Sequence, residues 1–110
     1  MASAPTTLLT GKTAIVTGGT RGIGAGISRE LVSRGANVAM IYLNSDKTDA
    51  SEKFATELRA LGTGNAVAIR ADLGEENGPG IIVQETLKKF SVKTIEIIGK
   101  LRRKGRTDRY

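Results

Sequence analysis

The sequence predicts an α/β protein built on a doubly wound parallel sheet. Two observations lead to this fold class. Four short apolar runs of strand length alternate with three longer segments whose apolar residues recur at helical spacing, and the links between them are short. Since strand–helix–strand crossovers within one sheet are right-handed, we expect the strand order 3-2-1-4, with the first two helices on one face and the third on the other.

The first strand is expected at Ala14–Val16, where consecutive apolar residues suit a strand that is buried on both faces. A helix follows over about 22–35, because Ile23, Ile27 and Leu31 recur at intervals of four and form a stripe that can lie on the sheet. The glycine at the end of this segment is suited to a left-handed C-cap.

The second strand, Asn37–Leu43, is a nearly continuous apolar run. Ser45 has the chemistry of an N-cap for a second helix, which ends near Gly62. The predicted buried positions of this helix are Ala50, Phe54, Leu58 and Leu61. The third strand is expected at Asn65–Arg70.

A third helix is expected after the turn-rich segment 74–80, because Pro79 suits a first helical turn. Its predicted buried residues are Val83, Leu87 and Phe90. The fourth strand is expected at Lys93–Ile98. Asp72 and Leu73 follow the third strand directly, at the carboxyl end where ligands bind in open α/β sheets.

The segment between the first strand and the first helix has the composition of a phosphate-binding loop. It runs Thr17-Gly-Gly-Thr-Arg-Gly-Ile-Gly24, with a glycine spacing that differs from the common G-x-G-x-x-G. Its glycines let the backbone approach a ligand, and the helix that follows directs unpaired N–H groups and a positive dipole end at the turn. We therefore expect a dinucleotide here, in a Rossmann-like domain. The alternative is a tight strand-to-helix turn that binds no ligand.

The residues after the second strand indicate which dinucleotide binds. NAD-binding members of this fold carry an acidic residue about 20 positions beyond the glycines, and Tyr42 holds that place here. Tyr42, Asn44 and Ser45 offer hydroxyls and an amide, and the guanidinium of Arg21 suits a 2′-phosphate. We therefore expect NADP(H). Asp46 would supply the missing acid if the second strand ran further.

The composition excludes several kinds of chemistry. The 110 residues contain no Cys and no His, so disulfides, thiol chemistry, imidazole catalysis and the usual zinc sites are excluded, and we expect no metal. The N-terminal segment has neither a basic region nor a long apolar stretch. We therefore expect no secretory signal, no membrane association and a cytoplasmic location.

The net charge of +6 is concentrated at one end of the chain. Residues 1–98 carry 11 Lys and Arg against 10 Asp and Glu, whereas residues 99–110 carry six against one. We expect the first range to be the dinucleotide-binding domain and the second a basic, disordered tail. No aromatic platform accompanies the tail, so no nucleic-acid partner is expected.

From Leu9 to about Ile98 the sequence resembles the N-terminal part of a short-chain dehydrogenase/reductase, since the glycine loop matches the family's T-G-x3-G-x-G signature. The segment 35–45 is most similar to the fungal polyketide ketoreductases, the hydroxynaphthalene and versicolorin reductase group. The resemblance implies an oxidoreductase of secondary metabolism that reduces a carbonyl substrate with NADP(H). It also implies a set of cofactor-binding residues: Gly18, Thr20, Arg21, Gly22, Ile23 and Gly24 in the glycine loop, Tyr42, Asn44 and Ser45 at the 2′-phosphate, and Asp72 and Leu73 at the adenine.

The family's catalytic residues have no counterpart in this sequence. After the fourth strand the family continues with Asn-Asn-Ala-Gly, a catalytic Ser and Tyr-x-x-x-Lys, whose Tyr exchanges a proton with the substrate. This chain continues with Gly99-Lys-Leu-Arg102, and its tyrosines are Tyr42 and Tyr110. We therefore assign no catalytic residue and expect no turnover. The chain is either a shortened ketoreductase, whose carbonyl substrate binds only a full-length form, or a non-catalytic nucleotide-binding or partner-binding module.

The change of pattern at Ile98 leads us to expect a shortened form, truncated after the fourth strand. Gly99-Lys-Leu101 can be encoded with GTAAGT, a typical intron start, so translated intron is one origin of the tail, and a frameshift or a degenerate gene is the other. Genomic DNA beyond codon 98 distinguishes these origins. A sheet that stops at its fourth strand leaves an exposed edge, so we expect a marginally stable chain that associates, for example as a homo-oligomer.

Overall fold

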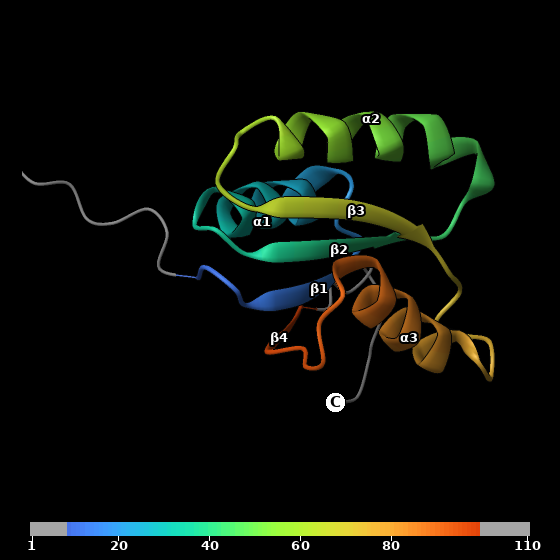
Figure 1. Ribbon diagram of the computed structural model, residues 1–110. Coiled ribbons are helices and arrows are strands. Elements are labelled where there is room, and N and C mark those ends of the chain that lie inside the picture. Colours follow the sequence, from blue (N-terminus) through green and yellow to red (C-terminus); the bar gives the residue numbers. More distant parts are fainter. Residues whose placement is uncertain (1–8, 100–110) are drawn as a thin grey trace, which may run out of the picture.

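The computed structural model describes residues 9–99, which form a four-stranded parallel sheet flanked by helices (Figure 1). The elements in chain order are β1 (Thr13–Thr17), α1 (Gly22–Ser33), β2 (Asn37–Tyr42), the 3-10 helix η1 (Ser45–Lys47), α2 (Thr48–Arg59), β3 (Asn65–Arg70), α3 (Gly78–Phe90) and β4 (Ile97–Gly99). The strands lie in the order β3-β2-β1-β4, and each neighbouring pair is parallel. The predicted fold class and strand order are confirmed.

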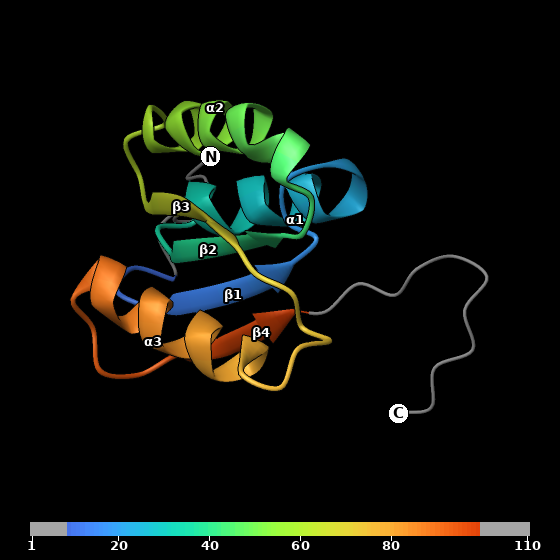
Figure 2. The ribbon, with the colours of Figure 1, turned by 90° about the vertical axis from the view of Figure 1, so that its right-hand side faces the viewer.

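Helices α1 and α2 cover one face of the sheet and α3 covers the other, as Figures 1 and 2 show from two directions. The first face holds a core that includes Val16, Met40 and Leu58, and the second holds a smaller core that includes Ile15 and Ile82. Successive residues of a strand point to opposite faces, so the adjacent Ile15 and Val16 belong to different cores. This two-sided burial explains why the central strands are continuous apolar runs.

The buried face of each helix differs in part from the predicted one, although Leu58 is buried as predicted. The first two residues of the predicted stripe on α1 are exposed, Ile23 by 76% and Ile27 by 40%. The residues that the helices bury are Gly24, Ser28 and Val32 in α1, Ser51, Ala55 and Leu58 in α2, and Gly78, Ile82 and Thr86 in α3. Small side chains let a helix lie close to the sheet, and their buried hydroxyls bond to carbonyl groups, as Thr86 Oγ1 does to Ile82. Of the other apolar residues that were predicted to be buried, Leu31, Phe54 and Phe90 are partly buried against the cores, whereas Ile23, Ile27, Leu61 and Val83 are exposed.

Strand β4 is shorter than predicted. The expected strand began at Lys93, but only Ile97–Gly99 pair with β1, opposite Ala14–Val16. Glu96, just before the strand, bonds to β1 through its backbone N–H, which donates to the Thr13 carbonyl over 2.9 Å, and through its side chain. Gly99 therefore belongs to the sheet, and the rest of the predicted tail, 100–110, lies outside the described residues. The domain boundary after Ile98 stays a prediction.

Several other element boundaries follow the expected pattern. The third strand has the predicted limits, and Pro79 lies in the first turn of α3. The backbone is left-handed at Gly35, with φ +98°, and at Gly62, with φ +79°, as expected for residues that end α1 and α2.

Candidate functional site

The carboxyl ends of β1, β2 and β3 meet at one edge of the sheet, where the predicted cofactor-binding residues lie (Figure 2). The register pairs Thr17 with Ile41 and Tyr42 with Arg70, so the loops that leave these strands begin side by side. The strand order reverses next to β1. Open α/β sheets bind ligands at such a point.

The first half of the glycine loop is fixed by close backbone contacts. The N–H of Gly18 donates to the Ile41 carbonyl over 2.9 Å and so extends the β1–β2 ladder into the loop. Gly19 is buried, and a Cβ there would lie 2.8 Å from the Val16 carbonyl oxygen and 2.9 Å from the Ser28 hydroxyl. That hydroxyl donates to the Gly19 carbonyl over 3.1 Å, which joins α1 to the loop. Sequence reasoning missed Gly19, although the Gly-Gly pair was a signal for such an approach.

The second half of the loop opens toward solvent. Gly22 begins α1 with φ +61°, and a Cβ built there meets no described atom within 4 Å beyond its chain neighbours and the backbone of its own helix. The position therefore requires glycine for its conformation and leaves room for a ligand. The N-cap residue Arg21 makes no side-chain cap bond, and the first turn of α1 has no acidic residue. Helix N–H groups and a positive dipole end are thus directed at an open space that suits an anion.

The polar residues at the turn after β2 differ in their exposure. The Tyr42 ring is buried in the core under α2, and its hydroxyl donates to Thr48 Oγ1 over 3.1 Å. Asn44 and Ser45 are exposed. Tyr42 therefore anchors the turn to the core, whereas Asn44 and Ser45 are accessible to a ligand. A direct contact from Tyr42 to a 2′-phosphate stays a prediction.

The prediction that Ser45 caps the second helix is wrong. Ser45 begins η1, and the N-cap of α2 is Lys47, because the chain makes one 3-10 turn before α2 starts at Thr48. Asp46, the alternative acid for a ribose, is exposed within η1.

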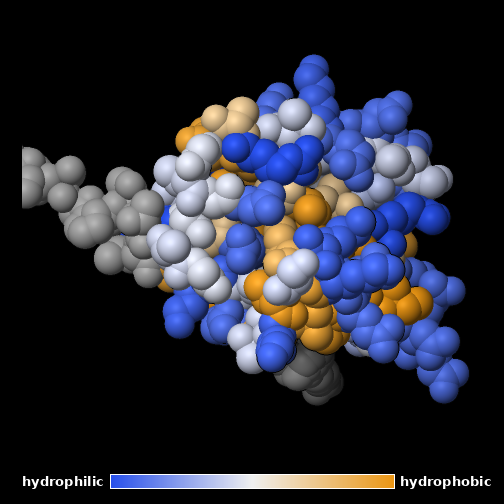
Figure 3. Space-filling model, viewed as in Figure 1, coloured by the Kyte–Doolittle hydropathy of each residue, from blue (hydrophilic) through white to orange (hydrophobic). Residues whose placement is uncertain are grey.

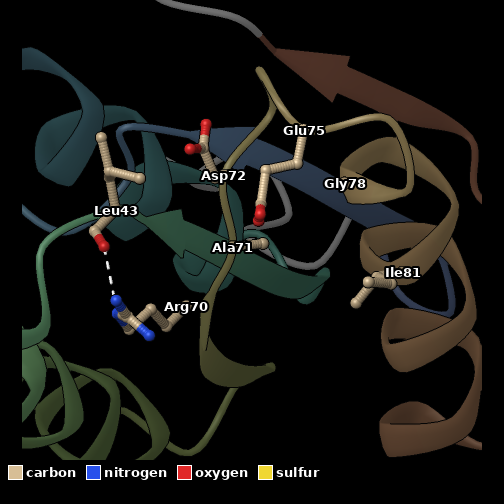
Figure 4. Close-up of a pocket in the computed structure, with 7 residues that line it drawn as sticks. All are labelled: Leu43, Arg70, Ala71, Asp72, Glu75, Gly78 and Ile81. Carbon is tan, nitrogen blue, oxygen red and sulfur yellow. Dashed lines mark hydrogen bonds between the residues drawn. The ribbon is translucent and has the colours of Figure 1, made fainter.

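A cavity of about 320 Å³ lies between the ends of β2 and β3 and the start of α3 (Figure 4). Its lining residues are Leu43, Arg70, Ala71, Asp72, Glu75, Gly78 and Ile81. One oxygen of the Asp72 carboxylate accepts the N–H of Gly74 over 2.8 Å, which holds the turn after β3. The predicted adenine residue Asp72 thus lines this cavity, whereas its neighbour Leu73 is exposed beside it.

The structure therefore gathers the predicted residues at one edge but gives them different exposure. Those that are exposed are Gly18, Arg21, Gly22, Ile23, Asn44, Ser45, Asp72 and Leu73; Thr20 is half-buried, and Gly24 and Tyr42 are buried. Arg70 lines the cavity without having been predicted as a site residue. Its signal in the sequence was a charged residue at the carboxyl end of a buried strand.

The profile of the family described as short chain dehydrogenase matches residues 12–99. The chain belongs to the short-chain dehydrogenase family. Similar curated proteins include versicolorin reductase 1 of Aspergillus parasiticus, 43% identical over 82 residues that are 74% of this chain and 30% of the relative. Hydroxynaphthalene reductase arp2 of Aspergillus fumigatus is 45% identical over 82 residues, which are 74% of this chain and 29% of that protein.

Solved structures of this family superpose on the sheet and its helices. A blue fluorescent protein from a metagenomic library, in complex with NADPH, has a TM-score of 0.74 and 33% identity, over 82% of this chain and 35% of that one. The Pseudomonas aeruginosa RhlG/NADP complex has a TM-score of 0.69 and 35% sequence identity. This match covers 87% of the present chain and 35% of the RhlG chain. This short-chain dehydrogenase chain thus spans about a third of the length of the proteins that it matches. Within residues 9–99, no helix is long and apolar enough to cross a membrane.

Proposed function

We propose that this chain is the NADP(H)-binding part of a carbonyl-reducing oxidoreductase. The observation that carries the proposal is the open N-terminus of α1 at the carboxyl edge of the sheet, where Gly22 leaves room for a ligand and Arg21 is exposed. Helix N–H groups and a cation favour phosphate groups.

The geometry suggests which residues would bind each part of the cofactor. The first turn of α1 would hold the pyrophosphate, and Arg21, Asn44 and Ser45 the 2′-phosphate. The cavity beside Asp72, with the apolar Leu43 in its wall, has the mixed character of a site for a flat base with a polar edge. Two of the similar solved structures are NADPH or NADP complexes, which supports this choice of cofactor.

The substrate class is proposed from the relatives. Versicolorin reductase 1 and hydroxynaphthalene reductase arp2 are among the relatives that the chain resembles in sequence, so we propose a polyketide-type carbonyl substrate of secondary metabolism. Bound NADPH would supply the hydride. This chain would bind and orient the cofactor without catalysing the reduction, because its 110 residues contain no Tyr-x-x-x-Lys. The same absence supports the second candidate, a non-catalytic nucleotide-binding module.

Titration of the purified chain with NADPH and with NADH, followed by nicotinamide fluorescence, tests the cofactor. We expect saturable binding that favours NADPH and is weakened about tenfold or more by Arg21→Ala, the cost of one charge-assisted hydrogen bond, with little change for NADH. Arg29→Ala is the matched control, since Arg29 lies on α1 but stacks 5.4 Å from the Phe54 ring centre. A preference for NADH, or an equal loss of both nucleotides in Arg21→Ala, would contradict the 2′-phosphate assignment.

A further inference from the structure

Arg70 ties the turn that follows β2 to the end of β3. The β2–β3 ladder ends with the Ala71 N–H, which donates to the Tyr42 carbonyl over 2.9 Å. One residue beyond the end of β2, the Nε of Arg70 donates to the Leu43 carbonyl over 3.1 Å. Figure 4 shows the guanidinium beside this carbonyl, next to the chain that leaves β2. A side chain thus replaces the next backbone bond between the two strands.

This bond lies at the start of a segment with little burial. Leu43, Asn44 and Ser45 are all exposed, and the backbone bond from the Lys47 N–H to the Asn44 carbonyl, 3.0 Å long, lies within the turn itself. Exposed segments with few contacts open at low free-energy cost. A fixed Leu43 carbonyl therefore limits where Asn44 and Ser45 can lie.

Arg70 also connects the two parts of the proposed binding site for the adenosine end of the cofactor, which are the cavity and the turn after β2. Its side chain lines the same cavity as Leu43 and Asp72, while its hydrogen bond acts on the turn that carries Asn44 and Ser45. A ligand that places its base in the cavity and a phosphate at the turn would require the cavity and the turn to keep a fixed position relative to each other. Positioning a group correctly is energetically important when it must meet a small, highly charged ligand.

We propose that Arg70 is a positioning residue for 2′-phosphate selectivity: it holds the Leu43 carbonyl and so fixes Asn44 and Ser45 where the phosphate binds. This inference rests on the proposed function. Arg70 acts through the turn, so its loss lowers the affinity for a 2′-phosphate more than the affinity for the rest of the nucleotide.

The test compares adenosine 2′,5′-bisphosphate with 5′-AMP, which differs by the 2′-phosphate alone. For Arg70→Ala we expect the affinity for the bisphosphate to fall about fivefold to twentyfold, the effect of one hydrogen bond with a charged donor, and the affinity for 5′-AMP to fall less than about twofold. Arg70→Lys keeps a donor for the Leu43 carbonyl and should recover most of the selectivity. Amide hydrogen exchange at Lys47, whose N–H donates to the Asn44 carbonyl within the turn, should quicken in Arg70→Ala.

Arg59→Ala is the matched control. Arg59 makes the same kind of bond at the other end of β3, where its Nη1 donates to the Ala66 carbonyl over 2.7 Å, so its loss should change stability without changing the ratio of the two affinities. If the wild-type chain binds both nucleotides and Arg70→Ala leaves the ratio of the two affinities unchanged, the proposed role of Arg70 is wrong but the proposed function stands. A wild-type chain that binds neither nucleotide would overturn the proposed function as well.

Discussion

Two glycines of the loop, Gly19 and Gly22, are required for different physical reasons. Gly19 is required by packing, because a Cβ would meet the Val16 carbonyl oxygen and the Ser28 hydroxyl at less than 3 Å. Gly22 is required by conformation and by the proposed ligand, because its φ is +61° and the space beside it is open. A substitution at Gly19 should therefore damage the fold first, and one at Gly22 should damage binding first.

Gly22→Val is predicted to abolish NADPH binding. The branched side chain would fill the space at the start of α1 and would cost about 1–2 kcal/mol through its left-handed backbone. Gly26→Ala is the control on the same helix, since Gly26 is exposed and a Cβ there meets no atom within 4 Å. It should retain binding and stabilise the chain by up to about 1 kcal/mol. Fluorescence titration and thermal unfolding measure both effects, and undiminished binding by Gly22→Val would refute the loop assignment.

At the scale of elements, the carboxylate of Glu96 links the start of β4 to β1. Glu96 Oε1 accepts the Thr13 N–H over 2.8 Å, and Oε2 accepts the Thr94 hydroxyl over 2.7 Å. The bond from Thr13, the bond from Thr94 and the charge of Lys12 together lower the pKa of Glu96, because each favours the ionised form. The short β4 is therefore joined to β1 by an ionised side chain as well as by its ladder.

Stability should consequently fall in acid through Glu96. Because its pKa is lower in the folded than in the unfolded chain, its contribution is full above the ordinary Glu pKa of about 4.3 and is lost as the pH falls from there through the folded pKa. Glu96→Gln should be less stable than the wild type at pH 7, and the difference should shrink in acid. Urea unfolding across this pH range measures this difference, with Glu57→Gln, at an exposed position of α2, as control. A difference that is independent of pH would contradict this role.

At the scale of the whole molecule, apolar side chains are exposed on β4 and on α3. Ile98 on β4 is 70% exposed, and Ile81 and Val83 are exposed on α3. Figure 3 shows hydrophobic atoms on the lower part of the face that it presents. On the other side of the sheet Ile23 and Ile27 are exposed on α1. Exposed apolar surface beside a strand edge favours association.

The 110-residue chain is therefore predicted to self-associate. Its weight-average mass in analytical ultracentrifugation should rise with concentration, and Ile98→Lys should reduce this rise because a charge disfavours edge pairing. Leu61→Lys is the control, since Leu61 is also an exposed apolar residue, at 43%, but follows α2 and not β4. A monomeric wild-type chain with sharp, reversible unfolding would show that this prediction is wrong.

The strand order, most element limits and the glycine loop could be predicted from the sequence. They depend on local properties: apolar periodicity, helix-ending glycines and the right-handedness of crossovers. The chemistry of Arg21, Asn44 and Ser45 could likewise be assigned from residue type and place along the chain. These features need no knowledge of which distant side chains meet.

The tertiary structure alone decided which residues face one another. Periodicity identified α1 as a helix but not that Gly24, Ser28 and Val32 form its buried face, because small residues pack closest to a sheet and an apolar count cannot rank them. The contact of Gly19 with Ser28 and the bond of Arg70 to Leu43 join segments 9 and 27 residues apart. Such contacts arise only when the sheet brings its strand ends together, so the sequence pattern could signal the residues Gly19 and Arg70 but not the partners that they contact.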